Sequence, residues 1–106
     1  MIAKTPKPPY YAVIFTSTLR VEDPLYVETA NRMEELAKEM PGYLGIESAR
    51  NEIGISVSYW KDEASIKNWK MQTEHLLAQK LGKEKWYASF KTRVALVQRD
   101  NGFEKE

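Results

Sequence analysis

Cysteine is absent from this chain of 106 residues, and histidine occurs once, as His75. Without cysteine there is no disulfide framework, no thiol nucleophile and no thiolate metal site, and a cytoplasmic protein is the default expectation. The five glycines are dispersed, so the chain lacks the glycine-rich loops that bind phosphates in nucleotide-dependent enzymes. Nor do acidic residues cluster at ligand spacing, so we expect no metal site.

Long apolar runs are missing as well. No segment approaches the ~20 residues needed to span a bilayer, and residues 1–9 lack the apolar centre of a signal peptide. The 16 basic and 15 acidic residues nearly cancel, and the basic ones are scattered along the chain. We therefore expect neither a nucleic acid nor a membrane as partner.

Hydrophobic periodicity predicts one domain, with an extended lead-in (1–9), a core (10–99) and a polar tail (100–106). Asp23 and Pro24 mark the start of a first helix, since Asp is a good N-cap and proline fits the first helical position. Asp62 caps a second helix, predicted as one continuous helix to about Leu81. The expected strands are 10–17, 44–50, 53–60 and 87–98.

The order strand, helix, strand, strand, helix, strand predicts an α+β, ferredoxin-like subunit with a four-stranded antiparallel sheet. Both helices would cover one face of that sheet. The first strand is nevertheless apolar on both sides, since Tyr11 and Phe15 alternate with Tyr10 and Ile14. A second copy of the sheet is the simplest cover for the other face, so we expect a homodimer.

The predicted second helix carries two faces of interest. A core face would contain Ile66, Trp69, Thr73, Leu76 and Leu77. An uncharged face would contain Asn68, Met71, Gln72, His75 and Gln79. Neutral polar side chains beside a core face fit the rim of a ligand cavity, a subunit contact or ordinary surface.

His75 is the default proton-transfer candidate, because an imidazole titrates near neutral pH. Trp60 and Trp69 would either wall a flat aromatic ligand by stacking or pack as core residues. Arg93 on the last strand would either balance an acidic group of the ligand or pair with Glu47.

The sequence resembles the antibiotic biosynthesis monooxygenase family over residues 10–99. Met40-Pro41-Gly42-Tyr43-Leu44-Gly45, Tyr59-Trp60 and Ile66-Lys67-Asn68-Trp69 carry the resemblance. It implies a dimeric α+β barrel built from ferredoxin-like subunits. The family includes cofactor-free oxygenases of polycyclic phenols, haem-degrading oxygenases and small members without an assigned substrate.

Two branches of that family can be compared residue by residue. Trp69 matches the catalytic tryptophan of the haem-degrading branch. The iron-binding histidine of that branch falls on Gln79 here, while His75 lies about one turn earlier. Its first-strand asparagine falls near Thr16 or Ser17. The resemblance therefore disfavours haem.

We accordingly predict a cofactor-independent monooxygenase that acts on a small aromatic or polycyclic substrate. The expected catalytic residues are His75, Trp69 and Asn68, and the expected substrate-binding residues are Trp60, Tyr59, Gln72 and Met71. Two alternatives remain: a haem-binding or haem-degrading monooxygenase, and a non-catalytic dimer that binds a small hydrophobic molecule.

Overall fold

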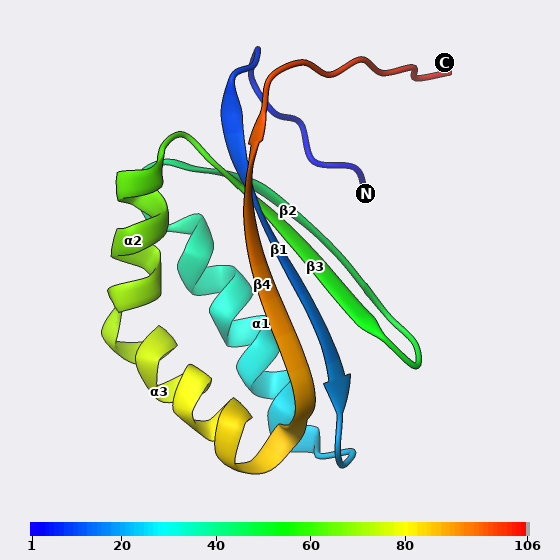
Figure 1. The fold of residues 1–106 in the computed structure, drawn as a ribbon, viewed down its shortest axis with the longest axis vertical. Helices are drawn as coiled ribbons and strands as arrows, with labels where there is room; N and C mark the ends of the chain where they lie inside the picture. Colours follow the sequence, from blue (N-terminus) through cyan, green and yellow to red (C-terminus); the bar gives the residue numbers. More distant parts are fainter. Residues whose placement is uncertain (106) are drawn as a thin grey trace.

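The computed structural model describes residues 1–105, which contain four strands and three helices (Figure 1). In chain order they are β1 (Tyr10–Leu19), α1 (Pro24–Lys38), β2 (Tyr43–Arg50), β3 (Gly54–Trp60), α2 (Glu63–Met71), α3 (Thr73–Leu81) and β4 (Tyr87–Val97), with a π-helical turn at Gly82–Trp86. The ferredoxin-like fold is confirmed, with its second helix in two pieces. None of the helices in this range is long and apolar enough to cross a membrane.

The strands form one antiparallel sheet in the order β2-β3-β1-β4. All three helices lie on one face of it (Figure 1). α1 packs mainly on β2 and α2 mainly on β3, so the edge strand β4 is the least covered by helices. Glu106, the last residue of the predicted tail, lies outside the described residues.

Residues that stand opposite each other in neighbouring antiparallel strands project to the same face. Tyr11 stands opposite Trp60, and Trp60 contacts α2, so this set belongs to the helix-covered face. Tyr10, Ala12 and Ile14 therefore project to the second face.

Both chain ends are fastened to that second face. The Ala3 amide donates to Glu47 Oε2 at 2.8 Å. The Thr5 hydroxyl donates to the Tyr10 hydroxyl at 3.0 Å, and Tyr10 donates in turn to Asp100 at 2.5 Å. The extended lead-in thus makes specific contacts with the sheet.

The prediction of one continuous second helix is wrong, because the chain is extended at Gln72 (φ −61°, ψ 133°). The break shifts the phase of the turns that follow, so the predicted core face fails beyond Trp69. Leu76 and Leu77 are 41% and 60% exposed. Neither proline nor glycine lies at the break to predict it.

The start of α2 is locked against the turn that precedes β2. Asp62 Oδ1 accepts from the Ser65 amide at 2.8 Å and from its hydroxyl at 2.6 Å, a standard N-cap. Gly42 has φ +83°, and any Cβ there would collide with Ser65. The positive φ and the close approach both require glycine, and together they fix where α2 meets the sheet.

Candidate functional site

Four aromatic rings form a column between the helices and the sheet. Tyr43 meets Trp60 edge-on with 5.7 Å between ring centroids. Trp60 stacks on Trp69 at 6.1 Å, and Trp69 stacks on His75 at 4.0 Å with only 13° between the ring planes. Trp60 is 0% exposed, so it supports the column from within. The half-buried Trp69 and His75 form the accessible end.

His75 is held in one tautomer. Its Nδ1 lies 2.8 Å from the Trp69 carbonyl oxygen, and a carbonyl can only accept, so Nδ1 carries the proton. Nε2 is then the nitrogen with a free lone pair. Burial lowers the pKa of His75, although the hydrogen bond to Trp69 opposes that shift. A neutral imidazole with Nε2 as acceptor is the resting state near neutral pH.

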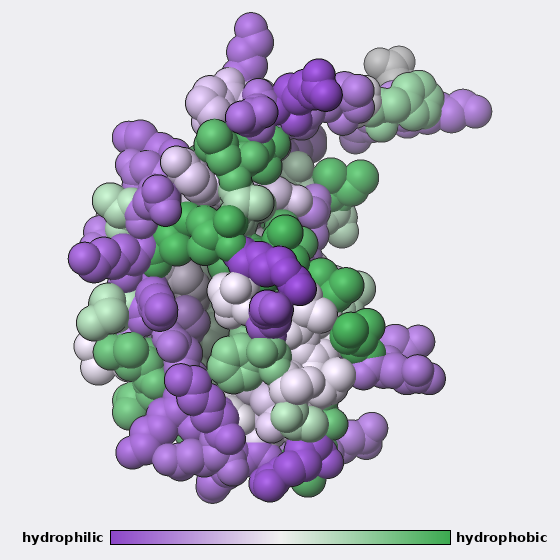
Figure 2. Space-filling model, viewed as in Figure 1, coloured by the Kyte–Doolittle hydropathy of each residue, from purple (hydrophilic) through white to green (hydrophobic). Residues whose placement is uncertain are grey.

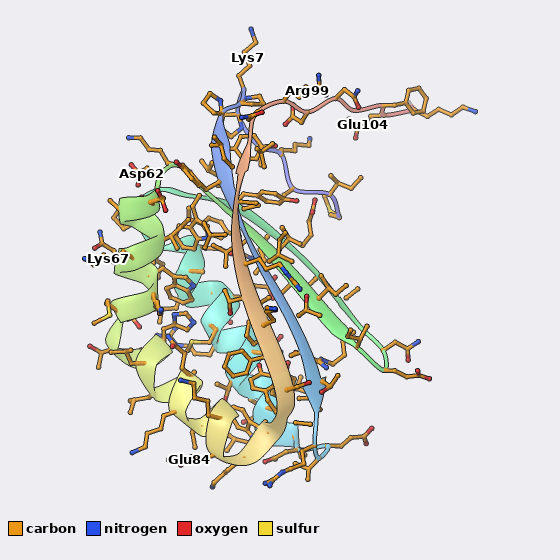
Figure 3. The ribbon with its side chains drawn as sticks, in the orientation of Figure 1. Lys7, Asp62, Lys67, Glu84, Arg99 and Glu104 are labelled. Atoms are coloured by element: carbon orange, nitrogen blue, oxygen red, sulfur yellow. The ribbon has the colours of Figure 1, made fainter. Side chains whose placement is uncertain are left out.

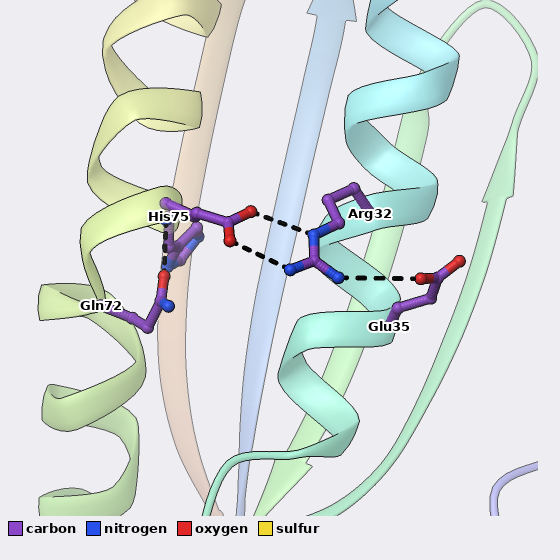
Figure 4. Close-up of polar contacts among 5 residues, drawn as sticks. Arg32, Glu35, Gln72 and His75 are labelled. Carbon is purple, nitrogen blue, oxygen red and sulfur yellow. Dashed lines mark hydrogen bonds and ion pairs between the residues drawn. The ribbon is translucent and has the colours of Figure 1, made fainter.

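The break at Gln72 creates this geometry. At the end of α2 the only backbone amide that donates to the Trp69 carbonyl is that of Gln72, at 3.2 Å. The carbonyl oxygen therefore remains available to accept from the imidazole. Gln72 also caps α3, because its Oε1 accepts from the His75 amide at 2.9 Å (Figure 4). Both ends of the break therefore contact His75.

The structure brings together His75, Trp69, Trp60 and Gln72 among the predicted site residues. Asn68 and Met71 are exposed on α2, and the structure gives neither a contact with the column. Sequence periodicity placed them beside His75 on one continuous helix, and the break at Gln72 changes that spacing.

Tyr59 lies on the opposite face of the sheet from Trp60. Its hydroxyl donates to Glu47 Oε1 at 2.7 Å, and its ring meets Tyr10 edge-on at 5.8 Å. Burial and the Glu47 carboxylate raise the pKa of Tyr59 to about 12. The structure therefore separates Tyr59 from the aromatic column.

Glu47 is bound by Tyr59 and the Ala3 amide rather than by Arg93. Arg93 stands on β4 opposite Ile14, on the second face. Trp86 is buried, and its indole donates to Asp23 Oδ2 at 3.0 Å.

An apolar strip on β4 was missed by sequence reasoning. Leu96, Val94 and Phe90 stand opposite Tyr11, Val13 and Ser17, so they face the helical layer. They are nevertheless 47%, 50% and 41% exposed. Figure 2 shows apolar side chains gathered along this side of the molecule. Apolar residues at the even positions 90, 94 and 96, interrupted by Thr92, were the signal available, and the strip lies on the same side of the sheet as the column.

Two shallow grooves lie elsewhere. One of about 330 Å³ runs between α1 and α3 and is crossed by a two-point ion pair from Arg32 to Glu74, both contacts 3.0 Å (Figure 4). The other, of about 200 Å³, contains Thr16, Lys91 and Arg93. Neither includes a residue that was predicted as catalytic or substrate-binding, although the second contains Arg93. Within residues 1–105, no three His, Asp or Glu side chains come together to hold a metal ion.

The fold of this chain is similar to that of several proteins of known structure. SnoaB of Streptomyces nogalater, described as a cofactor-independent oxygenase, matches with a TM-score of 0.70 at 10% identity, over 92% of this chain and 100% of that one. A protein of Shewanella oneidensis matches with a TM-score of 0.77 at 8% identity, over 93% and 100%. At such identities these matches establish the fold alone.

Sequence comparison goes further. The uncharacterized protein YqjZ of Bacillus subtilis (strain 168) is 48% identical over 105 residues, which are 97% of this chain and 92% of that protein. The model of the antibiotic biosynthesis monooxygenase family matches residues 14–81. The chain therefore belongs to the antibiotic biosynthesis monooxygenase family.

Proposed function

We propose that the protein is a cofactor-independent monooxygenase of a small aromatic or polycyclic phenol. The observation that carries this proposal is the state of His75. The imidazole is neutral, stacked on Trp69, and has its Nε2 lone pair free. A neutral base on the same side of the sheet as the apolar strip of β4 is suited to removing a phenolic proton from a flat ligand.

In the proposed reaction the substrate supplies all the electrons. Nε2 of His75 takes the phenolic proton, and the resulting anion donates electrons from a ring carbon to dioxygen, forming a carbon–oxygen bond. The O–O bond then breaks. One oxygen remains on the ring as a carbonyl, and the other leaves as water with the hydrogen that this carbon had carried and the phenolic proton that His75 returns. No external reductant is needed.

The remaining predicted residues take supporting roles in this proposal. Trp69 borders the ligand beside His75, and Trp60 holds Trp69 in place. Gln72 uses its Oε1 to cap α3, and its amide nitrogen has no partner within residues 1–105, so it serves as a donor to the developing anion. Asn68, one turn earlier, is a second donor, and Met71 is an outer contact. Tyr59 has no place in this site.

We also propose that a second copy covers the free face of the sheet. One cross-strand row on that face runs Glu47, Val57, Ile14, Arg93, with opposite charges at its two edges. A two-fold axis would bring the acidic edge of one sheet near the basic edge of the other, over an apolar centre. Light scattering would overturn this if it gave the mass of one 12.3 kDa chain.

Oxygen consumption tests the proposed activity. A panel of naphthols and anthrones is supplied to the unmodified protein, to His75→Gln and to Lys67→Gln. Lys67 lies on the same helical layer and points into solvent (Figure 3), so its variant controls for surface changes. We expect His75→Gln to lower kcat by roughly 100-fold or more, with Lys67→Gln unchanged.

Two results would contradict the proposal. Ligand binding without oxygen uptake would make the protein a non-catalytic binder of small hydrophobic molecules. A saturable haemin absorption band that is lost in His75→Gln would make His75 an iron ligand instead.

A further inference from the structure

Arg50 reaches across the sheet from its edge. It ends β2 and stands opposite Gly54 of β3, which in turn stands opposite Ser17 of β1. The guanidinium passes over Gly54 and donates to the Ser17 hydroxyl and, at 3.4 Å, to the Ser17 carbonyl. A Cβ at position 54 would collide with this guanidinium. The glycine therefore gives the arginine its path.

This guanidinium has no acidic partner. Within residues 1–105 the ion pairs join Arg32 to Glu35 and Glu74, and no carboxylate lies within pairing distance of Arg50. Arginine has five N–H donors, and two contacts to Ser17 leave several of them unused. Arg50 as a whole residue is exposed.

Aromatic rings surround the charge. The guanidinium lies 5.6 Å from the centroid of the Tyr26 ring, and Tyr26 meets Tyr87 edge-on at 5.8 Å. Burial raises the pKa of the Tyr87 hydroxyl and the Tyr26 phenol raises it further, while the Arg50 charge opposes them. Tyr87 is therefore a neutral hydroxyl close enough to feel the guanidinium.

The same row of the sheet ends the apolar strip on β4. Ser17 stands opposite Phe90, and Phe90 packs at 5.7 Å from Tyr87. Neighbouring strands lie ~4.8 Å apart, so Phe90 is one strand beyond the Ser17 hydroxyl that the guanidinium contacts. A ligand lying along the strip would have this charge at one end. The row of the sheet that contains Trp60, where the column begins, is six residues away along the strands, or ~20 Å.

We propose that Arg50, held over Gly54 by Ser17 and flanked by Tyr26 and Tyr87, binds an acidic group of the ligand that lies on the β4 strip. This inference rests on the proposed function, because it takes the strip as the substrate surface. The ligand is then an elongated aromatic molecule with a phenolic hydroxyl at the His75 end and a carboxylate at the Arg50 end. The planar guanidinium suits the two oxygens of a carboxylate.

Calorimetric titration with two matched ligands tests the proposal. One is a naphthol that carries a carboxylate at the end of a chain long enough to place it ~20 Å from the hydroxyl, and the other is the same naphthol with an uncharged chain of equal length. We expect the unmodified protein to bind the carboxylate ligand about tenfold more tightly, the usual size of a charge-assisted hydrogen bond. Arg50→Gln should remove this preference and leave the affinity for the uncharged ligand unchanged, which also reports that the variant is folded.

Gly54→Ala keeps the arginine but blocks its path, and it should remove the preference as well. Lys67→Gln removes a positive charge from α2 and should keep the preference for the carboxylate ligand, as should His75→Gln. A preference that survives in Arg50→Gln would overturn the proposal. Naphthol binding and oxidation without any preference would overturn it and leave the proposed function standing, whereas failure of both ligands to bind would overturn both.

Discussion

The two halves of the helical layer begin alike and then diverge. Asp23 caps α1 by accepting from the Leu25 amide at 2.9 Å, and Asp62 caps α2 by accepting from the Ser65 amide at 2.8 Å. α1 then runs unbroken for 15 residues and buries Leu36 and Ala37. The other half breaks into two helices of nine residues each, and α3 has no buried residue.

The difference separates support from chemistry. α1 is a continuous helix that buries Leu36 and Ala37 and packs Tyr26 against Trp86 and Tyr87. α2 and α3 instead meet at a junction that is held by stacked rings and hydrogen bonds. The break forgoes one stretch of helical bonding, and it orients His75 through the Trp69 carbonyl and the Gln72 side chain. A side chain placed at such a junction has fewer orientations than one on an ordinary helix surface.

The largest effect should come from the ring that supports the divided half. Trp60→Ala should lower the free energy of unfolding by ~3–5 kcal/mol, because Trp60 is fully buried beneath Trp69 and its removal leaves a cavity. Urea denaturation measures it. Trp69→Ala, which removes a half-buried ring, should cost less. If both substitutions lowered the free energy of unfolding equally, the accessible end of the column would stabilise the fold as much as Trp60 does.

A matched pair of leucines tests the contrast directly. Leu36 in α1 is 7% exposed and Leu77 in α3 is 60% exposed. Leu36→Ala should destabilise the protein by about 2–5 kcal/mol, and Leu77→Ala should stay within roughly 0.5 kcal/mol. The comparison would break if Leu77→Ala were the costlier change, since α3 would then be buried in solution, for example by a partner.

Removal of the junction cap should have a smaller effect. Gln72→Ala deletes the acceptor of the His75 amide and should lower stability by ~1 kcal/mol, as loss of an N-cap does. The His75 ring resonances in NMR should shift at the same time, since the imidazole adjoins the break. Glu74→Gln changes the residue that precedes His75, and it tests whether the His75 ring resonances shift for any change nearby. A more stable Gln72→Ala protein would indicate that the two helices had merged.

The smallest effect should be the pH dependence due to His75. Burial lowers the pKa of the folded imidazole below the ~6.5 of an unfolded histidine. Between these two pKa values the unfolded chain binds more protons, so stability falls as the pH drops through about 6.5 and is fully present above it. Urea midpoints of the unmodified protein and of His75→Gln, compared across this range, isolate the contribution. A histidine that stabilised the fold more at the lower pH would contradict a neutral imidazole.

Sequence periodicity was sufficient for the sheet and its connections, because alternation and turn residues are local signals. It gave the hairpin of β2 and β3 and the capped start of α2. It failed at Met71-Gln72-Thr73, where the chain is extended at Gln72 although no proline or glycine signals a break. The opposite faces of Tyr59 and Trp60 were readable from strand alternation, although both had been assigned to one site.

The site was harder to predict than the fold, because it depends on side-chain directions across distant segments. No sequence spacing relates His75 Nδ1 to the carbonyl of Trp69. A predicted hairpin brings Arg50 and Gly54 opposite each other, but only the packed structure directs the guanidinium over the glycine to Ser17.

That passage over Gly54 has a consequence for how the protein can change through descent. Any mutation that adds a side chain at position 54 displaces the guanidinium of Arg50, while loss of Arg50 removes the need for glycine. The residues at positions 50 and 54 should therefore change together in evolution. Lineages that keep the arginine should keep the glycine, and lineages free to vary at position 54 should already have lost the arginine.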